Sequence, residues 1–182
     1  MARTQSNPIR PGSSAPDFAL LDVANGDQPS LAQLSGENGT LILFICNHCP
    51  FVKHIEQGLR DLAADYIERG IGIIAINSND VKAYPDDAPQ YMAEKQYPFP
   101  YLYDATQQVA RAYQATCTPD IFLFDAQLRL YYHGQFDDSR PSNGIEPSGS
   151  DLRAALDCLL VRKTAPLPQK PGMGCSIKWR NT

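Results

Sequence analysis

Two cysteines three positions apart, Cys46 and Cys49, are the residues of this 182-residue chain best suited to chemistry. A pair with this spacing can close a small disulfide, so it can cycle between a dithiol and a disulfide while the protein stays folded. The nucleophile in such chemistry is the thiolate. His48 lies between the two cysteines, and as a proton donor it would stabilise a Cys46 thiolate and lower its pKa. We therefore predict that Cys46 attacks, that Cys49 resolves, and that His48 tunes the pair.

The flanking sequence places the pair where a strand turns into a helix. Residues 41–45 are an unbroken apolar run, which predicts a buried strand. From about residue 50 to residue 68, apolar residues recur on one face of a predicted helix. They are Phe51, Ile55, Leu59, Leu62 and Tyr66. Because a helix N-terminus offers unpaired N–H groups and a partial positive charge, it favours a thiolate at this junction.

The remaining elements predict an α/β fold. A second apolar run at residues 71–76 completes a strand–helix–strand unit, typical of a parallel sheet covered on both faces. We further predict a short strand at 17–21, short helices at 90–95 and 106–113, a hairpin formed by 121–124 and 128–132, and a helix at 151–161. The predicted organisation is an N-terminal arm (1–15), one domain (16–163) that includes an insertion at 78–100, and a tail (164–182) that packs on the domain.

Composition narrows the functional classes. Hydrophobic residues make up 43% of the chain and charged residues 20%, an ordinary globular balance. The net charge of -4 argues against a nucleic-acid partner, and no apolar run approaches the length of a membrane span. The N-terminal residues show no apolar stretch of the signal-peptide type. We therefore expect a cytoplasmic protein, in which a C-x-x-C pair is more often catalytic or metal-binding than structural.

The order of these elements resembles the thioredoxin fold, with the cysteine pair at the first strand–helix junction and Thr118-Pro119 before the hairpin. Over most of residues 14–180 the chain resembles bacterial peroxiredoxin-like, thioredoxin-domain proteins of the redoxin (AhpC/TSA) type. The segments that carry the resemblance are 46–53 (CNHCPFVK), 78–80 (SND), 84–87 (YPDD), 97–104 (YPFPYLYD), 117–120 (CTPD), 137–141 (DDSRP) and 174–179 (GCSIKW). The resemblance implies a central mixed sheet flanked by helices and redox chemistry at cysteine, and we expect no cofactor.

The resemblance also implies roles around the pair. Pro119, in a cis peptide bond after Thr118, would hold its backbone opposite the cysteines and offer edge groups to a substrate disulfide. Cys117 would lie close by, either as a further redox thiol or as a small buried residue. Thioredoxin carries a buried carboxylate where this chain has Thr40, so no proton acceptor for the second thiol is identified. A peroxiredoxin carries Thr where this chain has Cys46, which predicts weak peroxidase activity.

The tail contains a further cysteine, Cys175. The Pro-rich stretch 166–171 is stiff and extended, so it can lead the chain across the surface. Glycines at 172 and 174 permit close backbone contact, and Ile177 and Trp179 supply an apolar anchor. We therefore expect Cys175 to lie near the pair, with a redox or a docking role.

For the other polar residues we expect surface positions without a catalytic role. We expect Asp137, Asp138 and Arg140 in a solvated loop, with the alternatives of orienting a substrate or holding the tail. Residues 53 and 54, a lysine and a histidine, are expected on the exposed side of the first long helix. Cys158 falls off the apolar face of the last helix, and we assign it no role.

Three functions remain open at this point. The first is a thiol–disulfide oxidoreductase that acts on protein or small-molecule disulfides, with an unknown thiol reductant. The second is a thiol-dependent peroxidase, in which one cysteine is oxidised to a sulfenic acid. The third is a non-catalytic metal-binding protein that uses Cys46, His48, Cys49 and Cys175, a set of N and S ligands that suits zinc.

Overall fold

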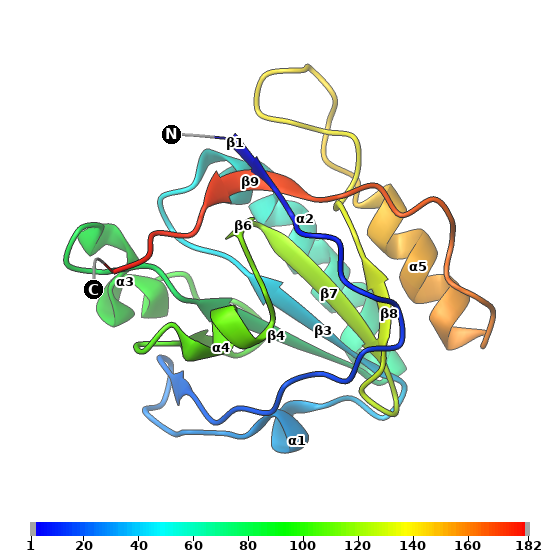
Figure 1. Cartoon of the computed structure of the whole chain (residues 1–182), viewed down its shortest axis with the longest axis horizontal. Coiled ribbons are helices and arrows are strands. Elements are labelled where there is room, and N and C mark those ends of the chain that lie inside the picture. The colour runs from blue at the N-terminus through cyan, green and yellow to red at the C-terminus, as the bar shows by residue number, and fades with distance from the viewer. Residues whose placement is uncertain (1–2, 181–182) are drawn as a thin grey trace.

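A computed structural model describes residues 3–180 and has a mixed six-stranded sheet at its centre, in the order β2-β5-β4-β3-β7-β8 (Figure 1). Its strands are β2 (Leu21–Asp22), β3 (Gly39–Phe44), β4 (Ile71–Asn77), β5 (Tyr101–Tyr103), β7 (Asp120–Asp125) and β8 (Leu130–His133). β3 is parallel to β4 and antiparallel to β7, so the strand that leads to the cysteine pair lies inside the sheet. The predicted mixed sheet is therefore confirmed.

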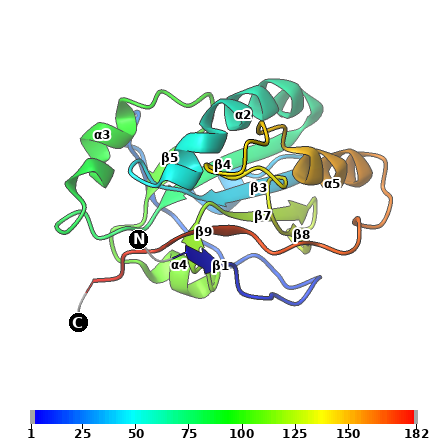
Figure 2. The same cartoon turned by 90° about the horizontal axis from the view of Figure 1, so that it is seen from above.

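Helices cover both faces of this sheet (Figure 2). They are α1 (Leu31–Leu34), α2 (Pro50–Tyr66), α3 (Pro89–Ala93), α4 (Gln108–Ala112) and α5 (Ser150–Leu160), with 3₁₀ turns η1 (Ile67–Arg69) and η2 (Pro85–Asp87). All six residues of β3 are buried, and alternate ones point to opposite faces. Leu41 and Leu43 pack with α2 and α5, while Ile42 and Phe44 pack with α1 and α4. The unbroken apolar run at 41–45 reflects this two-sided burial.

A second, smaller sheet joins segments that are far apart in the sequence. Its strands, in the order β1-β9-β6, are β1 (Arg3–Gln5), β9 (Met173–Ser176) and β6 (Cys117–Thr118). All the pairings are antiparallel, and Cys175 on β9 lies opposite both Arg3 and Thr118. Figure 1 shows β9 and β1 crossing beside β6, next to α2. The tail is therefore part of a sheet beside the cysteine pair.

Most predicted elements are confirmed within a few residues, including the hairpin β7–β8. The strand predicted at 17–21 is wrong, because the pairing lies at β2 and residue 19 makes only an isolated bridge. Strand β5, directly after the predicted insertion at 78–100, was not predicted, and it pairs with both β4 and β2. Among residues 3–180, no helix combines the length and apolar character that crossing a bilayer requires. Residues 1–2 of the predicted arm and 181–182 of the predicted tail lie outside the described residues.

Candidate active site

The two cysteines lie in the short loop between β3 and α2. Pro50 is the first residue of α2, where its missing N–H costs nothing, and Cys49 is the N-cap residue. Cys46 lies one turn earlier, in the loop. Cys49, and not Cys46, therefore occupies the N-terminus of α2. Both side chains are buried, at 1% exposure for Cys46 and 0% for Cys49.

Thr118 and Pro119 lie against the pair, and the peptide bond between them is cis, as predicted. The Thr118 hydroxyl lies 3.3 Å from the Cys46 sulfur. The Cys49 sulfur lies 3.1 Å from the Thr118 carbonyl oxygen, which accepts its hydrogen bond when the thiol is protonated. One residue therefore holds both sulfurs in place.

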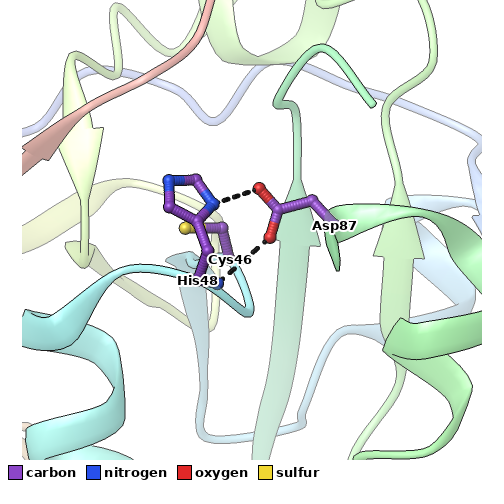
Figure 3. A group of neighbouring side chains, drawn as sticks. All are labelled: Cys46, His48 and Asp87. Atoms are coloured by element: carbon purple, nitrogen blue, oxygen red, sulfur yellow. Dashed lines mark hydrogen bonds and ion pairs between the residues drawn. The ribbon is translucent and has the colours of Figure 1, made fainter. Parts of the chain in front are cut away.

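Asp87, at the end of η2, is a site residue that the sequence did not single out. Its carboxylate accepts hydrogen bonds from the His48 ring Nδ1 at 2.6 Å, from the backbone N–H groups of Asn47 and His48 at 2.7 and 3.3 Å, and from the Asn79 side chain at 2.8 Å (Figure 3). Burial alone would raise the pKa of Asp87. The hydrogen bonds from His48, Asn79 and Asn47 outweigh burial and lower that pKa below the usual carboxyl range. Asp87 is therefore a buried carboxylate anion.

This carboxylate fixes the orientation of His48. Because an ionised carboxylate only accepts hydrogen bonds, Nδ1 of His48 carries a proton, and in the neutral ring Nε2 is the nitrogen that can accept one. Tyr84 stacks on the ring with centroids 4.7 Å apart. Nε2 is buried and has no hydrogen-bond partner among the described residues. One nitrogen of His48, the Cys46 sulfur and an Asp87 oxygen lie within 4.8 Å of one another. His48 and Asp87 thus lie close to the Cys46 sulfur.

The two thiols of the pair titrate together. A hydrogen bond from the Cys46 thiol, aided by the Cys175 thiol and the Val52 backbone N–H and opposed by burial, lowers the pKa of Cys49 to about 5. The same hydrogen bond to Cys49, together with burial and the negative charge of Asp87, raises the pKa of Cys46 far above the ordinary thiol range. The surroundings of the pair therefore favour a negative charge on Cys49, whereas the sequence predicted a Cys46 thiolate.

The other two predicted cysteines differ in their surroundings. Cys175, on β9, is buried and shares a hydrogen bond with Cys49; burial and this bond raise its pKa to about 12. The Cys117 thiol donates to the Pro119 carbonyl oxygen at 3.5 Å, and burial raises its pKa above the usual thiol range. Cys175 is thus the thiol that the tail brings to the pair.

The loop after β8 is not the solvated loop that we expected. Asp137 is buried, and it accepts hydrogen bonds from the backbone N–H groups of Ser139, Ser148 and Gly149. Arg140 donates to two carbonyl groups of the same loop. The predicted alternative, that this segment holds the tail, fits Asp138, which pairs with the tail residue Lys170 at 2.8 Å.

His54 also differs from its prediction, whereas Lys53 is exposed as expected. His54 is half-buried and lines a cavity of about 20 Å³ beside Pro119 and Met173. Its Nε2 and the Ser139 hydroxyl have no hydrogen-bond partner among the described residues. The cavity is large enough for one water molecule. Cys158 is half-buried on α5, away from these groups.

The metal-ligand set proposed from sequence does not gather as a unit. Among the described residues, the donor atoms that converge are those of Cys46, His48 and Asp87, without Cys49 or Cys175. Both carboxylate oxygens of Asp87 already accept hydrogen bonds. The arrangement fits a proton relay better than a zinc site, which takes four ligands.

Fold and site together define a thioredoxin-like protein with a buried dithiol. The sequence profile of the AhpC/TSA family matches residues 11–133, more than half of the chain. The chain therefore belongs to the AhpC/TSA family.

Solved structures and a curated relative agree with this class. An uncharacterized conserved protein from Geobacillus kaustophilus is 50% identical, with a TM-score of 0.97 over 100% of this chain and 98% of that one. A hypothetical protein from Sinorhizobium meliloti is 46% identical, with a TM-score of 0.95 over 98% and 100% of the two chains. A thioredoxin domain of a Bacteroides vulgatus thiol-disulfide oxidoreductase shares the fold at 19% identity and a TM-score of 0.59, covering 69% of this chain and 89% of that chain.

One curated relative is the thiol-disulfide oxidoreductase ResA of Oceanobacillus iheyensis. The two sequences are 28% identical over 115 residues, which make up 62% of this chain. The match spans 58% of the length of that relative.

Proposed function

We propose that this protein is a thiol–disulfide oxidoreductase with Cys46 and Cys49 as its redox pair. The observation that carries the proposal is the arrangement of the site: Cys49 is the N-cap residue of α2 and has a lowered pKa, and Cys46 lies close to His48 and the Asp87 carboxylate. The similarity to ResA, a protein named for this activity, supports it.

In the first step the Cys49 thiolate attacks one sulfur of a substrate disulfide. A new bond forms between Cys49 and that sulfur, and the substrate S–S bond breaks. The other substrate sulfur leaves as a thiolate with the bonding electron pair. The N–H groups at the start of α2 stabilise Cys49 as the attacking anion.

In the second step Cys46 resolves the mixed disulfide. Nε2 of His48 takes the thiol proton of Cys46, and Asp87 stabilises the resulting imidazolium. The Cys46 sulfur then bonds to Cys49 and expels the second substrate thiolate, which accepts the proton from His48. The substrate gains two electrons and the pair becomes a disulfide. A thiol reductant must then supply two electrons to restore it.

Serine substitutions test these roles in single-turnover reduction of a small disulfide. Cys49→Ser should abolish reaction, whereas a protein that carries both Cys46→Ser and Cys175→Ser should react once and retain a mixed disulfide at Cys49, visible as a mass increase. Cys158→Ser, on α5, is the matched control and should behave as the wild type. Full activity of Cys49→Ser would exclude this mechanism. A mixed disulfide trapped on Cys46 in that variant would restore the assignment predicted from sequence.

A thiol-dependent peroxidase is the second candidate, favoured by the ionisable Cys49 followed by Pro50 at the helix start. Here the Cys49 thiolate attacks a peroxide oxygen and becomes a sulfenic acid, and an alcohol or water leaves. Cys46 then condenses with the sulfenic acid, water is released, and the same disulfide forms. Comparing the second-order rates for hydrogen peroxide and for a small disulfide separates the two candidates.

A cytoplasmic location is part of the proposal, because thiol pools there would keep the pair reduced between turnovers. Fractionation of cells that produce the protein, followed by alkylation of its free thiols, tests this placement. Recovery in an oxidising compartment would contradict it.

A further inference from the structure

Strand β9 approaches the active site so closely that only glycine fits beside Thr118. A Cβ atom added to Gly174 would lie 2.0 Å from the Thr118 carbonyl oxygen. The next residue, Cys175, lies directly opposite Thr118 in the antiparallel pairing of β6 with β9. Because Thr118 also contacts the sulfurs of Cys46 and Cys49, the register brings a third thiol to the same residue.

The chain on both sides of Cys175 is fixed by hydrogen bonds. Before it, the Gly172 N–H donates to the Ser6 hydroxyl at 2.8 Å, and the Ser6 N–H donates back to the Gly172 carbonyl oxygen at 3.0 Å. After it, the Ile177 N–H donates to the Thr116 carbonyl oxygen at 3.0 Å. Cys175 is therefore held at the site by backbone pairing.

The residues that follow anchor the tail further. The Lys178 N–H donates to the Asn79 side chain at 2.8 Å. Ile177 is buried in the core on the α4 side of the main sheet, and Trp179 stacks under Arg111 at 4.4 Å. The position of Cys175 thus depends on contacts with several elements of the domain.

The three thiols are arranged with Cys49 in the middle. The Cys46 and Cys175 thiols both lie close enough to Cys49 to lower its pKa. All three side chains are at most 2% exposed. A sulfur that lies between two other thiols can exchange a disulfide between them by side-chain movements.

Building on the function proposed above, we propose that Cys175 is a third redox thiol of the site, which takes over the disulfide from the Cys46–Cys49 pair at Cys49. The Cys175 thiolate attacks the Cys49 sulfur, the Cys46–Cys49 bond breaks, and Cys46 leaves with the bonding electron pair. Cys46 then takes up the proton that Cys175 has lost, with His48 as carrier. One disulfide and one thiol are present before and after, so no external oxidant or reductant is required.

This exchange replaces the disulfide within the loop before α2 by a disulfide between that loop and strand β9 of the small sheet. β9 already occupies the edge of β6 that would otherwise receive an extended substrate backbone. Cys175 therefore lies where the sulfur of a bound substrate is expected, and the tail acts as an internal substrate of the pair.

Disulfide mapping tests the proposal. Reduced wild-type and Cys46→Ser proteins are each treated with one equivalent of diamide, quenched in acid, alkylated and digested with trypsin. Lys53 and Lys163 lie between the pair and Cys175, so the digest separates them. We expect an intramolecular Cys49–Cys175 disulfide as the main product of Cys46→Ser, and both Cys46–Cys49 and Cys49–Cys175 disulfides in the wild type.

Two further variants complete the test. Cys175→Ser should yield the Cys46–Cys49 disulfide alone, and Cys158→Ser should match the wild type. A wild-type protein that forms Cys46–Cys49, but gives no Cys49–Cys175 link in either background, would overturn the relay and leave the proposed function intact. A wild-type protein that forms no Cys46–Cys49 disulfide would overturn the proposed function itself.

Discussion

Replacing Asp87 by Asn tests the proton acceptor with little change in shape. One carboxylate oxygen of Asp87 accepts from the backbone N–H groups of Asn47 and His48, and the other accepts from His48 Nδ1 and Asn79. In Asp87→Asn the amide oxygen can keep the backbone contacts, which places the NH₂ group against His48. Because that NH₂ donates to Nδ1, the ring proton moves to Nε2, and His48 can no longer accept the Cys46 proton.

The expected loss follows from the role of the base. A positioned general base contributes about 10²–10⁴-fold to a step that needs it, so resolution by Cys46 should slow by that factor. The variant also loses two hydrogen bonds to a charged acceptor, about 1.5–3 kcal/mol each. Because a domain is stable by about 5–15 kcal/mol, circular dichroism must first show that Asp87→Asn is folded.

Stopped-flow reaction with 5,5′-dithiobis(2-nitrobenzoate), with every protein carrying Cys175→Ser, separates the two steps. Attack by Cys49 releases one coloured thiolate, and resolution by Cys46 releases the second. Asp87→Asn should keep the first phase within a few-fold of the wild type and slow the second by about 10²–10⁴. The matched control is Asp86→Asn, a neighbouring exposed carboxylate, which should change neither phase. Equal second phases in the two variants, or a slowed first phase in Asp87→Asn, would refute the reasoning.

Three other predictions concern the packing of β9 on the site, the pKa of Cys49 and the effect of removing metal. Gly174→Ala should push β9 away from Thr118 and raise the alkylation rate of the buried thiols at least tenfold, whereas Gly172→Ala, with its nearest neighbour at 3.4 Å, should not. Since the Cys49 pKa is lowered to about 5, its alkylation should gain rate as pH rises through about 5; a midpoint near pH 9 would contradict this. Chelators should leave disulfide reduction unchanged; loss of activity restored by zinc would favour the metal-binding alternative.

The sequence could predict the centre of the fold because its signals there are local. Strands β3 and β4 are continuous apolar runs, and the helix face of α2 repeats with helical period. β5 could not be predicted in the same way, because it has three residues and follows two prolines, at 98 and 100. β9 reads Met-Gly-Cys-Ser, which has little strand propensity, so its conformation comes from pairing with β1 and β6.

In the candidate site, too, the residues in local motifs could be predicted from the sequence, and those brought in by the fold could not. The cysteine pair, His48 and Thr118-Pro119 lie in recognisable motifs. Asp87 is 39 residues from His48 and reaches it only because η2 folds back over the end of the sheet. The Cys46 and Cys49 roles depend on where α2 begins and on the charge of Asp87, and neither is a property of the C-x-x-C spacing. The interaction of the Asp87 charge with groups distant in the sequence produces no periodic residue pattern, so it could not be recognised from the sequence.

Because the thiols are buried next to the small sheet β1-β9-β6, their reactivity depends on local unfolding of that sheet. Its strands are two to four residues long, so β9 can separate while the six-stranded sheet stays intact. If buried sulfurs react only from such opened molecules, each 1.4 kcal/mol of opening free energy slows modification about tenfold. Amide hydrogens of Ser6 and Ile177, which are bonded across the same strands, should then exchange with solvent in proportion to the thiol modification rate. Low concentrations of urea should accelerate both processes together, well before the domain unfolds.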